Sequence, residues 1–205
     1  MLRLDWSGRR VLVTGHTGFK GSWLALWLHR LGAEVSGLSD EVPSLPSHFD
    51  VAGLGELIDD RRGDVRDPTA VDEVVAATRP EVVFHLAAQS LVRRSYLEPA
   101  DTFATNVGGT VNVLDAARRH EVPAVVCATT DKCYENREWP WGYREGDPLG
   151  GHDPYSASKA AAEVVIGSDR ASFPDGTRIA SIRGGNGSGP GDWAAAGMAA
   201  SASAA

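Results

Sequence analysis

Residues 10–21 read Arg-Val-Leu-Val-Thr-Gly-His-Thr-Gly-Phe-Lys-Gly, and this stretch decides the fold. Its first five residues are a short apolar run that ends at a glycine, which is typical of a buried strand. Three glycines follow at intervals of three, and apolar residues between Trp23 and Leu31 then recur at helical spacing. A strand, a glycine-rich turn and an amphipathic helix in this order predict a dinucleotide-binding turn, here spaced G-x-x-G-x-x-G rather than G-x-G-x-x-G.

Each glycine of this turn has an expected role. Gly15 makes the tight turn, Gly18 lets the backbone approach a pyrophosphate, and Gly21 lets the helix pack on the strand. The N-terminus of the helix offers free amide groups to the phosphates. Lys20 either reaches a phosphate or is solvated. The residues of the turn that we expect at the cofactor are Gly15, His16, Thr17, Gly18, Phe19, Lys20 and Gly21.

Strands and helices alternate along the rest of the chain. Asp67 before Pro68, and Asp153 before Pro154, each combine an N-cap with a proline at the first helical position, so both pairs predict the start of a helix. A helix from Pro99 is predicted to carry one apolar stripe, formed by Phe103, Val107, Val111 and Leu114. Strands are predicted over 10–14, 34–38, 57–59, 81–86, 124–129 and 178–183, a helix over 68–78, and a loop over 43–55. This alternation predicts an α/β fold, a doubly wound parallel sheet of Rossmann type with helices on both faces.

Composition and charge exclude several classes of protein. The 205 residues suit one domain or one domain plus a fragment, and a net charge of −7 without a basic stripe argues against a nucleic-acid surface. The longest apolar stretch, Trp23 to Leu28, is far shorter than the roughly 20 residues of a membrane span, and charges near the N-terminus leave no signal-peptide core. Two cysteines make no disulfide framework, and six histidines without a cluster predict no metal site. A cytoplasmic enzyme is expected.

The end of the chain differs from the rest. From Ala194 onward only Ala, Gly, Ser and Met occur, without apolar periodicity, and this composition builds no core. We therefore expect a dinucleotide-binding domain over 1–193 and a low-complexity tail over 194–205.

A second motif carries chemistry, and it reads Asp-Pro-Tyr-Ser-Ala-Ser-Lys over 153–159. Tyr155 and Lys159 lie one helical turn apart and therefore project from the same face. A phenol has an ordinary pKa of about 10, which a neighbouring ammonium is expected to lower. Such a pair can take a proton from a sugar hydroxyl while a nicotinamide takes the hydride. Together with the glycine turn, the motif predicts redox chemistry on an alcohol.

Cofactor contacts are also expected at the carboxyl ends of the strands, where ligands bind in open α/β sheets. Ser39, followed by Asp40, occupies the position that usually holds the adenosine ribose, which leaves the choice between NAD and NADP open. Asp64 either accepts a hydrogen bond from the adenine amine or caps its own loop. His85 fits a buried core histidine better than a catalyst. Further candidates for cofactor contact are Val65, Leu86, Ala87, Ala88 and Thr129.

Three polar residues follow the strand that ends near residue 129. Thr130 is expected to hydrogen-bond the substrate hydroxyl that Tyr155 attacks. Asp131 and Lys132 place an acid beside a base at the same edge of the sheet.

These motifs resemble the extended short-chain dehydrogenase/reductase family, which includes NAD-dependent epimerases and dehydratases. Within it, they are most similar to the branch of CDP-glucose 4,6-dehydratases. Related dTDP- and GDP-sugar dehydratases carry Asp-Glu where this chain has Asp131-Lys132. The stretches that carry the narrower resemblance are 15–21, 129–134, 136–139, 141–145, 153–156 and 183–193.

The resemblance implies NAD as the cofactor, the nucleotide sugar CDP-glucose as the substrate, and a homodimer. It implies that Tyr155, poised by Lys159, takes the C4 hydroxyl proton, that Asp131 protonates the departing C6 hydroxyl, and that Lys132 helps with the C5 proton. It also implies a smaller substrate domain, most of which this sequence lacks. The cofactor would further contact Asn106, Tyr155 and Lys159, and the substrate would contact Gln89, Ser90, Thr130 and Asn186.

Two other functions stay open. A sugar-nucleotide 4-epimerase or reductase shares the glycine turn and the Tyr-Lys pair but needs no acid and base for elimination, so Asp131 and Lys132 favour a dehydratase. The Ala/Ser tail instead favours a truncated, catalytically silent fragment that binds a dinucleotide.

Overall fold

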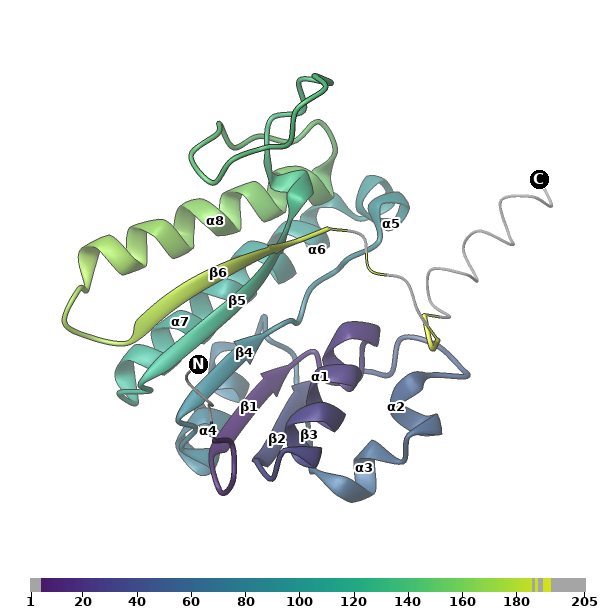
Figure 1. Ribbon diagram of the computed structural model, residues 1–205, viewed down its shortest axis with the longest axis vertical. Coiled ribbons are helices and arrows are strands. Elements are labelled where there is room, and N and C mark those ends of the chain that lie inside the picture. The colour runs from purple at the N-terminus through teal and green to yellow at the C-terminus, as the bar shows by residue number, and fades with distance from the viewer. Residues whose placement is uncertain (1–4, 186, 188–189, 193–205) are drawn as a thin grey trace.

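A parallel sheet of six strands forms the centre of the protein, as a computed structural model shows (Figure 1). The structure describes residues 5–185, 187 and 190–192, so the predicted tail and Asn186 lie outside it. The strands follow the order β3-β2-β1-β4-β5-β6, which confirms the doubly wound prediction. Their bounds are β1 Arg10–Thr14, β2 Glu34–Ser39, β3 Asp59–Arg62, β4 Val82–His85, β5 Ala124–Thr130 and β6 Arg178–Gly184.

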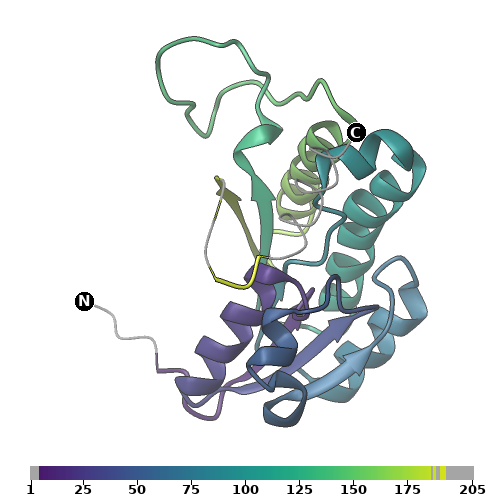
Figure 2. The same cartoon turned by 90° about the vertical axis from the view of Figure 1, so that its right-hand side faces the viewer.

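Helices cover both faces of the sheet (Figures 1 and 2). On one face lie α1 Phe19–Arg30, α2 His48–Val51 and α3 Leu54–Leu57. The other face carries α4 Pro68–Thr78, α5 Val92–Leu97, α6 Pro99–Phe103, α7 Gly109–Arg119 and α8 Pro154–Ser172. Alternate residues of a strand point to opposite faces, so Leu12 packs into the core under α4 and α7, whereas Val11 and Val13 pack into the core under α1. None of the described helices has the length and hydrophobicity of a membrane span.

The predicted helix starts are confirmed by their caps. The Asp67 carboxylate accepts a hydrogen bond from the Thr69 amide at 2.9 Å, and the Asp153 carboxylate accepts one from the Ser156 amide at 2.9 Å. A cap of this kind fixes where a helix begins. The start of α8 is therefore rigidly placed, and with it the helical face that carries Tyr155.

The region between β2 and β3 differs from the prediction. The predicted loop over 43–55 contains two short helices, α2 and the start of α3, and the Ser47 hydroxyl caps α2 by accepting from the Asp50 amide at 3.0 Å. The predicted strand over 57–59 starts two residues too early, because β3 is Asp59–Arg62. A search for apolar runs does not find this strand, because it lies at the edge of the sheet and is entirely polar.

The helix after Pro99 is continuous but contains a π-helical segment, Ala104–Gly108, between α6 and α7. Its predicted apolar stripe is partly wrong: Phe103 and Val111 are 38% and 44% exposed, whereas Leu114 is buried. The buried face instead carries three polar residues, Thr102, Asn106 and Thr110. Hydrogen bonds across the core outweigh the cost of burying these side chains.

Candidate functional site

The glycine turn between β1 and α1 has no room for a side chain at Gly15 or Gly21. Gly15 has a φ of +75°, and a Cβ atom there would lie 2.6 Å from the amide nitrogen of Ala87, just beyond β4. A Cβ atom at Gly21 would lie 2.0 Å from the carbonyl oxygen of Gly15. Gly15 therefore makes the tight turn, and Gly21 permits the close packing of α1 on β1.

The start of α1 presents backbone donors without a competing side chain. Its N-cap is Gly18, no side chain caps it, and its first turn contains no acidic residue. Amide groups in the first turn of a helix lack partners within the helix, and the helix dipole favours an anion there. The turn thus fits the pyrophosphate of a dinucleotide, because it combines a close backbone approach with free donors.

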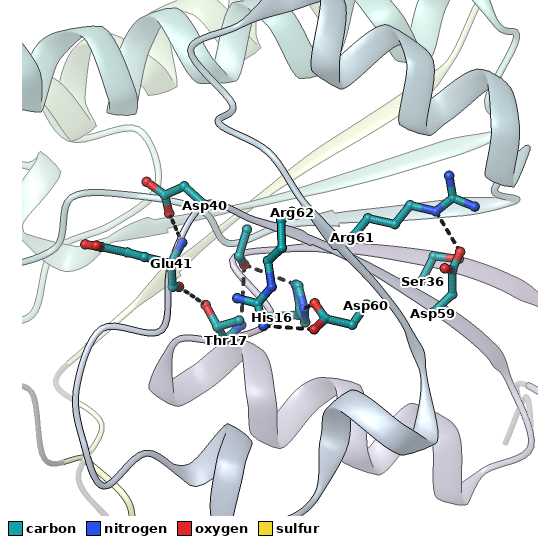
Figure 3. A network of polar contacts seen from close by, with 10 residues as sticks. His16, Thr17, Ser36, Asp40, Glu41, Asp59, Asp60, Arg61 and Arg62 are labelled. Atoms are coloured by element: carbon teal, nitrogen blue, oxygen red, sulfur yellow. Dashed lines mark hydrogen bonds and ion pairs between the residues drawn. The ribbon is translucent and has the colours of Figure 1, made fainter.

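His16 points away from this anion site and into the protein (Figure 3). Its ring is fully buried, and Nε2 lies 2.8 Å from the Asp60 carboxylate. On the other side of the ring, Nδ1 lies 3.1 Å from the Ser39 hydroxyl, which also accepts from the Thr17 amide at 3.4 Å. Burial lowers the pKa of His16, so the ring is neutral, donates to Asp60 and accepts from Ser39. Only the backbone of His16 is left for a cofactor.

Thr130, the last residue of β5, lies beside two groups with predicted roles, the acid Asp131 and the phenol base Tyr155. Its hydroxyl lies 3.0 Å from a carboxylate oxygen of Asp131, and as a hydrogen-bond donor beside the Tyr155 phenol it lowers the pKa of that phenol. A hydroxyl carries one proton, so Thr130 can donate to only one of these two groups at a time. Asp131 and Lys132 are both exposed, which leaves their side chains accessible.

Lys159 does not lower the pKa of Tyr155 in this structure, contrary to the prediction. The Tyr155 pKa is raised, mainly because the phenol is buried, and Asp131 and Asp153 raise it further. Lys159 instead donates to the Ala128 carbonyl at 3.1 Å, and burial lowers its own pKa to about 8. The helical spacing places the two side chains on one face but does not bring the ammonium to the phenol.

Gly185 and Pro190, which follow β6, both contact α1. Lys20 donates from Nζ to the Gly185 carbonyl at 3.3 Å, and the indole of Trp23 donates to the Pro190 carbonyl at 3.2 Å. A Cβ atom at Gly185 would lie 3.6 Å from the Asp131 carboxylate. Gly185 therefore lies close both to Lys20 of the glycine turn and to Asp131 at the end of β5.

Comparisons with known proteins agree with this arrangement. The model of the NAD dependent epimerase/dehydratase family matches residues 11–204. The chain belongs to this family. Its cofactor is accordingly NAD, and the glycine turn has the geometry to receive it.

Two curated relatives in the epimerase/dehydratase family are dehydratases. The chain is 50% identical over 197 residues to the CDP-glucose 4,6-dehydratase of Salmonella typhimurium, covering 92% of this chain and 55% of the relative. It is 37% identical to a dTDP-glucose 4,6-dehydratase of Streptomyces antibioticus, covering 76% and 47%. Among solved structures, a UDP-glucose 4-epimerase of Thermus thermophilus in complex with NAD is 32% identical with a TM-score of 0.73, covering 85% and 54%. The chain thus spans about half the length of these family members.

Several other predicted site residues have side chains that are already engaged within the protein. Asn106 is fully buried and clamps residue 89, because its amide accepts from the Gln89 amide at 2.9 Å and donates to the Gln89 carbonyl at 3.0 Å. Asp64 accepts from the Arg66 amide at 2.8 Å, which is the loop-cap alternative. Thr129 donates to Glu163. The contacts of these residues with a cofactor or substrate stay predictions.

His85 is a core residue in this family member, as expected. Thr14 lies 2.7 Å from Nδ1, and Thr110 lies 3.1 Å from Nε2. Burial lowers the pKa of His85 to about 3, so the ring stays neutral. Among the other predicted cofactor and substrate contacts, Leu86, Ala87, Ala88 and Ser90 follow β4, and Val65 is buried against Gly109.

The sequence interpretation missed a buried ion pair beside the site. Glu163 is 6% exposed, and its carboxylate accepts from Arg183 at 2.9 Å and from Ser181 at 3.0 Å. Arg183 also donates to the Tyr134 hydroxyl at 2.8 Å, which fixes the start of the long loop before α8 (Figure 2). One signal could have revealed this pair: Glu163 lies four residues after Lys159, on the buried face of α8.

Proposed function

We propose that the protein supplies the cofactor-binding and catalytic half of a sugar-nucleotide 4,6-dehydratase that acts on CDP-glucose. The observation that carries the proposal is the 50% identity to a CDP-glucose 4,6-dehydratase. Within the chain, the proposal rests on the acid and base side chains at the end of β5, where Thr130 bonds to Asp131 and lowers the pKa of Tyr155.

The first step is removal of the proton from the C4 hydroxyl by Tyr155, with Thr130 hydrogen-bonding the reacting oxygen. When bound, NAD would supply the hydride-transfer chemistry, as the acceptor of hydride from C4 and its donor to C6. Because burial raises the pKa of Tyr155, the phenol is harder to ionise than usual until a positive charge lies beside it. Lys159, with its pKa of about 8, is mainly protonated at neutral pH; its ammonium bonds to the Ala128 carbonyl in this structure, and it must turn toward the phenol to supply that charge.

The second step is elimination of water across C5 and C6. A 4-keto group acidifies the hydrogen on C5, and we assign to Lys132 the role of helping to remove it. Asp131 protonates the C6 hydroxyl as it leaves, and this is general acid catalysis. The sum is loss of one water with no net oxidation, and the product is a 4-keto-6-deoxy sugar nucleotide.

A 4-epimerase is the second candidate, because the solved structures that resemble the chain include UDP-glucose 4-epimerases in complex with NAD. An epimerase oxidises C4 and reduces the same carbon again. It needs Tyr155 and Lys159, but it has no use for a proton donor to the C6 hydroxyl. The exposed Asp131 therefore favours the dehydratase.

One experiment separates these functions and the silent fragment. The chain alone, and the chain fused to the C-terminal part of the Salmonella typhimurium relative that it does not match, are incubated with NAD and with CDP-, dTDP- or UDP-glucose. We expect the fusion to form the 4-keto-6-deoxy sugar from CDP-glucose, detected by its alkali-induced absorbance. The chain alone should bind NAD weakly and form little product, because remote binding energy orients the reacting carbon.

Two other outcomes would support the alternative functions, a 4-epimerase or a silent dinucleotide-binding fragment. Formation of the C4 epimer of the sugar would support an epimerase. No product from the fusion, despite bound NAD, would support a silent fragment.

A further inference from the structure

The carboxyl ends of β2 and β3 bring an unusual set of charges to the place where a dinucleotide fold meets the adenosine ribose. In this fold an acidic residue at the end of the second strand holds the ribose of NAD, or a nearby arginine accommodates the 2′-phosphate of NADP. Here the last residue of β2 is Ser39, and its partner in the β2–β3 register is Arg62. The end of β2 therefore has a guanidinium beside it, and its own last side chain carries no acid.

The Ser39 side chain is not free to contact the ribose, so it does not distinguish NAD from NADP. Its side chain is buried at 5% exposure, and its hydroxyl is engaged by the His16 ring and the Thr17 amide. The first acidic side chain after it is Asp40, one of whose oxygens accepts from the Glu41 amide at 2.8 Å (Figure 3).

Asp60 neutralises the guanidinium. One carboxylate oxygen of Asp60 accepts from His16 at 2.8 Å, and the other accepts from Arg62 Nη2 at 2.8 Å. The Arg62 guanidinium also lies over the Phe49 ring, 5.2 Å from its centroid, and its side chain is 40% exposed. It is thus held at the edge of the sheet by the Asp60 carboxylate (Figure 3) and by the face of the Phe49 ring.

We propose that Asp60 is a specificity-determining residue that makes the site select NAD over NADP by keeping Arg62 paired. A 2′-phosphate is a dianion that needs an unpaired guanidinium for a charge-assisted hydrogen bond. While Arg62 is paired, it offers little net charge, and the Asp60 carboxylate repels the phosphate. The ribose hydroxyl of NAD carries no charge and is little affected. This inference depends on cofactor binding alone and not on the sugar chemistry.

The test is Asp60→Asn in the 205-residue chain, with the affinities for NAD and NADP measured by calorimetric titration. Asparagine keeps an oxygen that accepts from His16, but it presents an NH₂ group to Arg62 and so releases the guanidinium. We expect NADP affinity to rise about tenfold, as one new charge-assisted contact would give, and NAD affinity to change little. The gain should shrink as salt concentration rises. Thermal unfolding of each variant checks that the fold is intact.

Two further variants show whether the gain passes through Arg62. In the double variant Asp60→Asn with Arg62→Met, the NADP gain should vanish, because methionine keeps the apolar stem over Phe49 without the charge. Asp59→Asn is the matched control, since Asp59 pairs with Arg61 at 2.7 Å with the same spacing on the same strand. Its side chain lies on the opposite face of the sheet, so the NADP to NAD ratio should stay at the parent value.

Three results would overturn the proposal. The first is an Asp60→Asn variant that folds and binds NADP no better than the parent. The second is a gain that persists without Arg62, or that Asp59→Asn reproduces. The third is a rise in NADP affinity in Asp40→Asn but not in Asp60→Asn. Asp40 would then be the residue that selects NAD. If the parent binds neither dinucleotide, the chain does not build this subsite and the proposal fails with it.

Discussion

The two ends of the carboxyl edge of the sheet use their side chains in opposite ways. On the side of β1 to β3, the His16 ring bonds to both Ser39 and Asp60, and the glycine turn offers a ligand backbone amides that no Cβ atom obstructs. On the side of β5 and α8, Asp131 is exposed and Tyr155 is only half-buried, so the reactive atoms are side chains. One end binds with the backbone and the other reacts with functional groups.

This difference predicts how each end responds to mutation. Changes at the glycine turn should act through sterics, and therefore on folding and cofactor affinity together. Changes at the β5–α8 end should act on chemistry and should not destabilise the fold. The variants below test this separation.

Tyr155→Phe should have the largest effect, on rate alone. We expect turnover of CDP-glucose in the fused protein to fall about 10³-fold, because the base is removed while the ring that packs is kept. NAD affinity, followed by fluorescence quenching, should be nearly unchanged. Tyr96→Phe, on an exposed tyrosine of α5, is the control and should retain turnover. A Tyr155→Phe variant within tenfold of the parent would remove Tyr155 from the mechanism.

Gly21→Ala should lower both stability and cofactor binding. The added methyl group would meet the Gly15 carbonyl oxygen, which is backbone and cannot move aside. We expect a loss of more than about 3 kcal/mol in the free energy of unfolding, measured in urea. Gly108→Ala is the matched control, because no atom lies within 4 Å of the added carbon and its φ is −60°. Equal stabilities of the two variants would refute the steric account of the turn.

Lys159→Met should stabilise the fold while it removes activity. Burial lowers the Lys159 pKa from 10.5 to about 8, which corresponds to a penalty of about 3 kcal/mol at neutral pH. The unfolded chain binds this proton more tightly than the folded chain, so the penalty is complete below about pH 8 and disappears as pH rises from 8 to 10.5. Urea midpoints of the parent and the variant should therefore differ most at pH 7 and converge at high pH. A parent that is more stable than the variant at pH 7 would contradict the burial argument.

Asp131→Asn should have the smallest effect and a distinct signature. An amide cannot protonate the departing C6 hydroxyl, so turnover in the fusion should fall about a hundredfold while oxidation at C4 continues. Reduced cofactor should then accumulate after CDP-glucose is added, visible as its absorbance. Normal product formation without that absorbance would show that Asp131 is not the acid.

Most of the fold could be predicted because local signals agreed with the tertiary structure. The turn at Gly15 and the caps at Asp67 and Asp153 lie where the residue types require them. The all-polar strand β3 could not be found from apolar patterning, because at the edge of the sheet it need not bury an apolar face.

The site was predicted in its residues more than in its interactions. Spacing put Tyr155 and Lys159 on one helical face, but it could not show that the Ala128 carbonyl takes the ammonium. Nor could it show that the His16 ring lies inward, since that depends on Asp60 on a strand 44 residues away in the chain. Long-range polar partners of this kind are set by tertiary packing and leave no local pattern.

The π-helical segment at Ala104–Gly108 acts as a spacing device. An ordinary helix advances by 3.6 residues a turn, so side chains four apart drift around the axis, whereas a wider turn keeps every fourth residue in line. Thr102, Asn106 and Thr110 are four apart, and they reach Gln89, Ser158 and His85. Deleting Thr105 would restore regular winding and leave Thr102 and Asn106 only three positions apart, so that their side chains would no longer lie in line. An insertion or deletion here would therefore separate these three side chains from their hydrogen-bond partners, although the helix itself would still form.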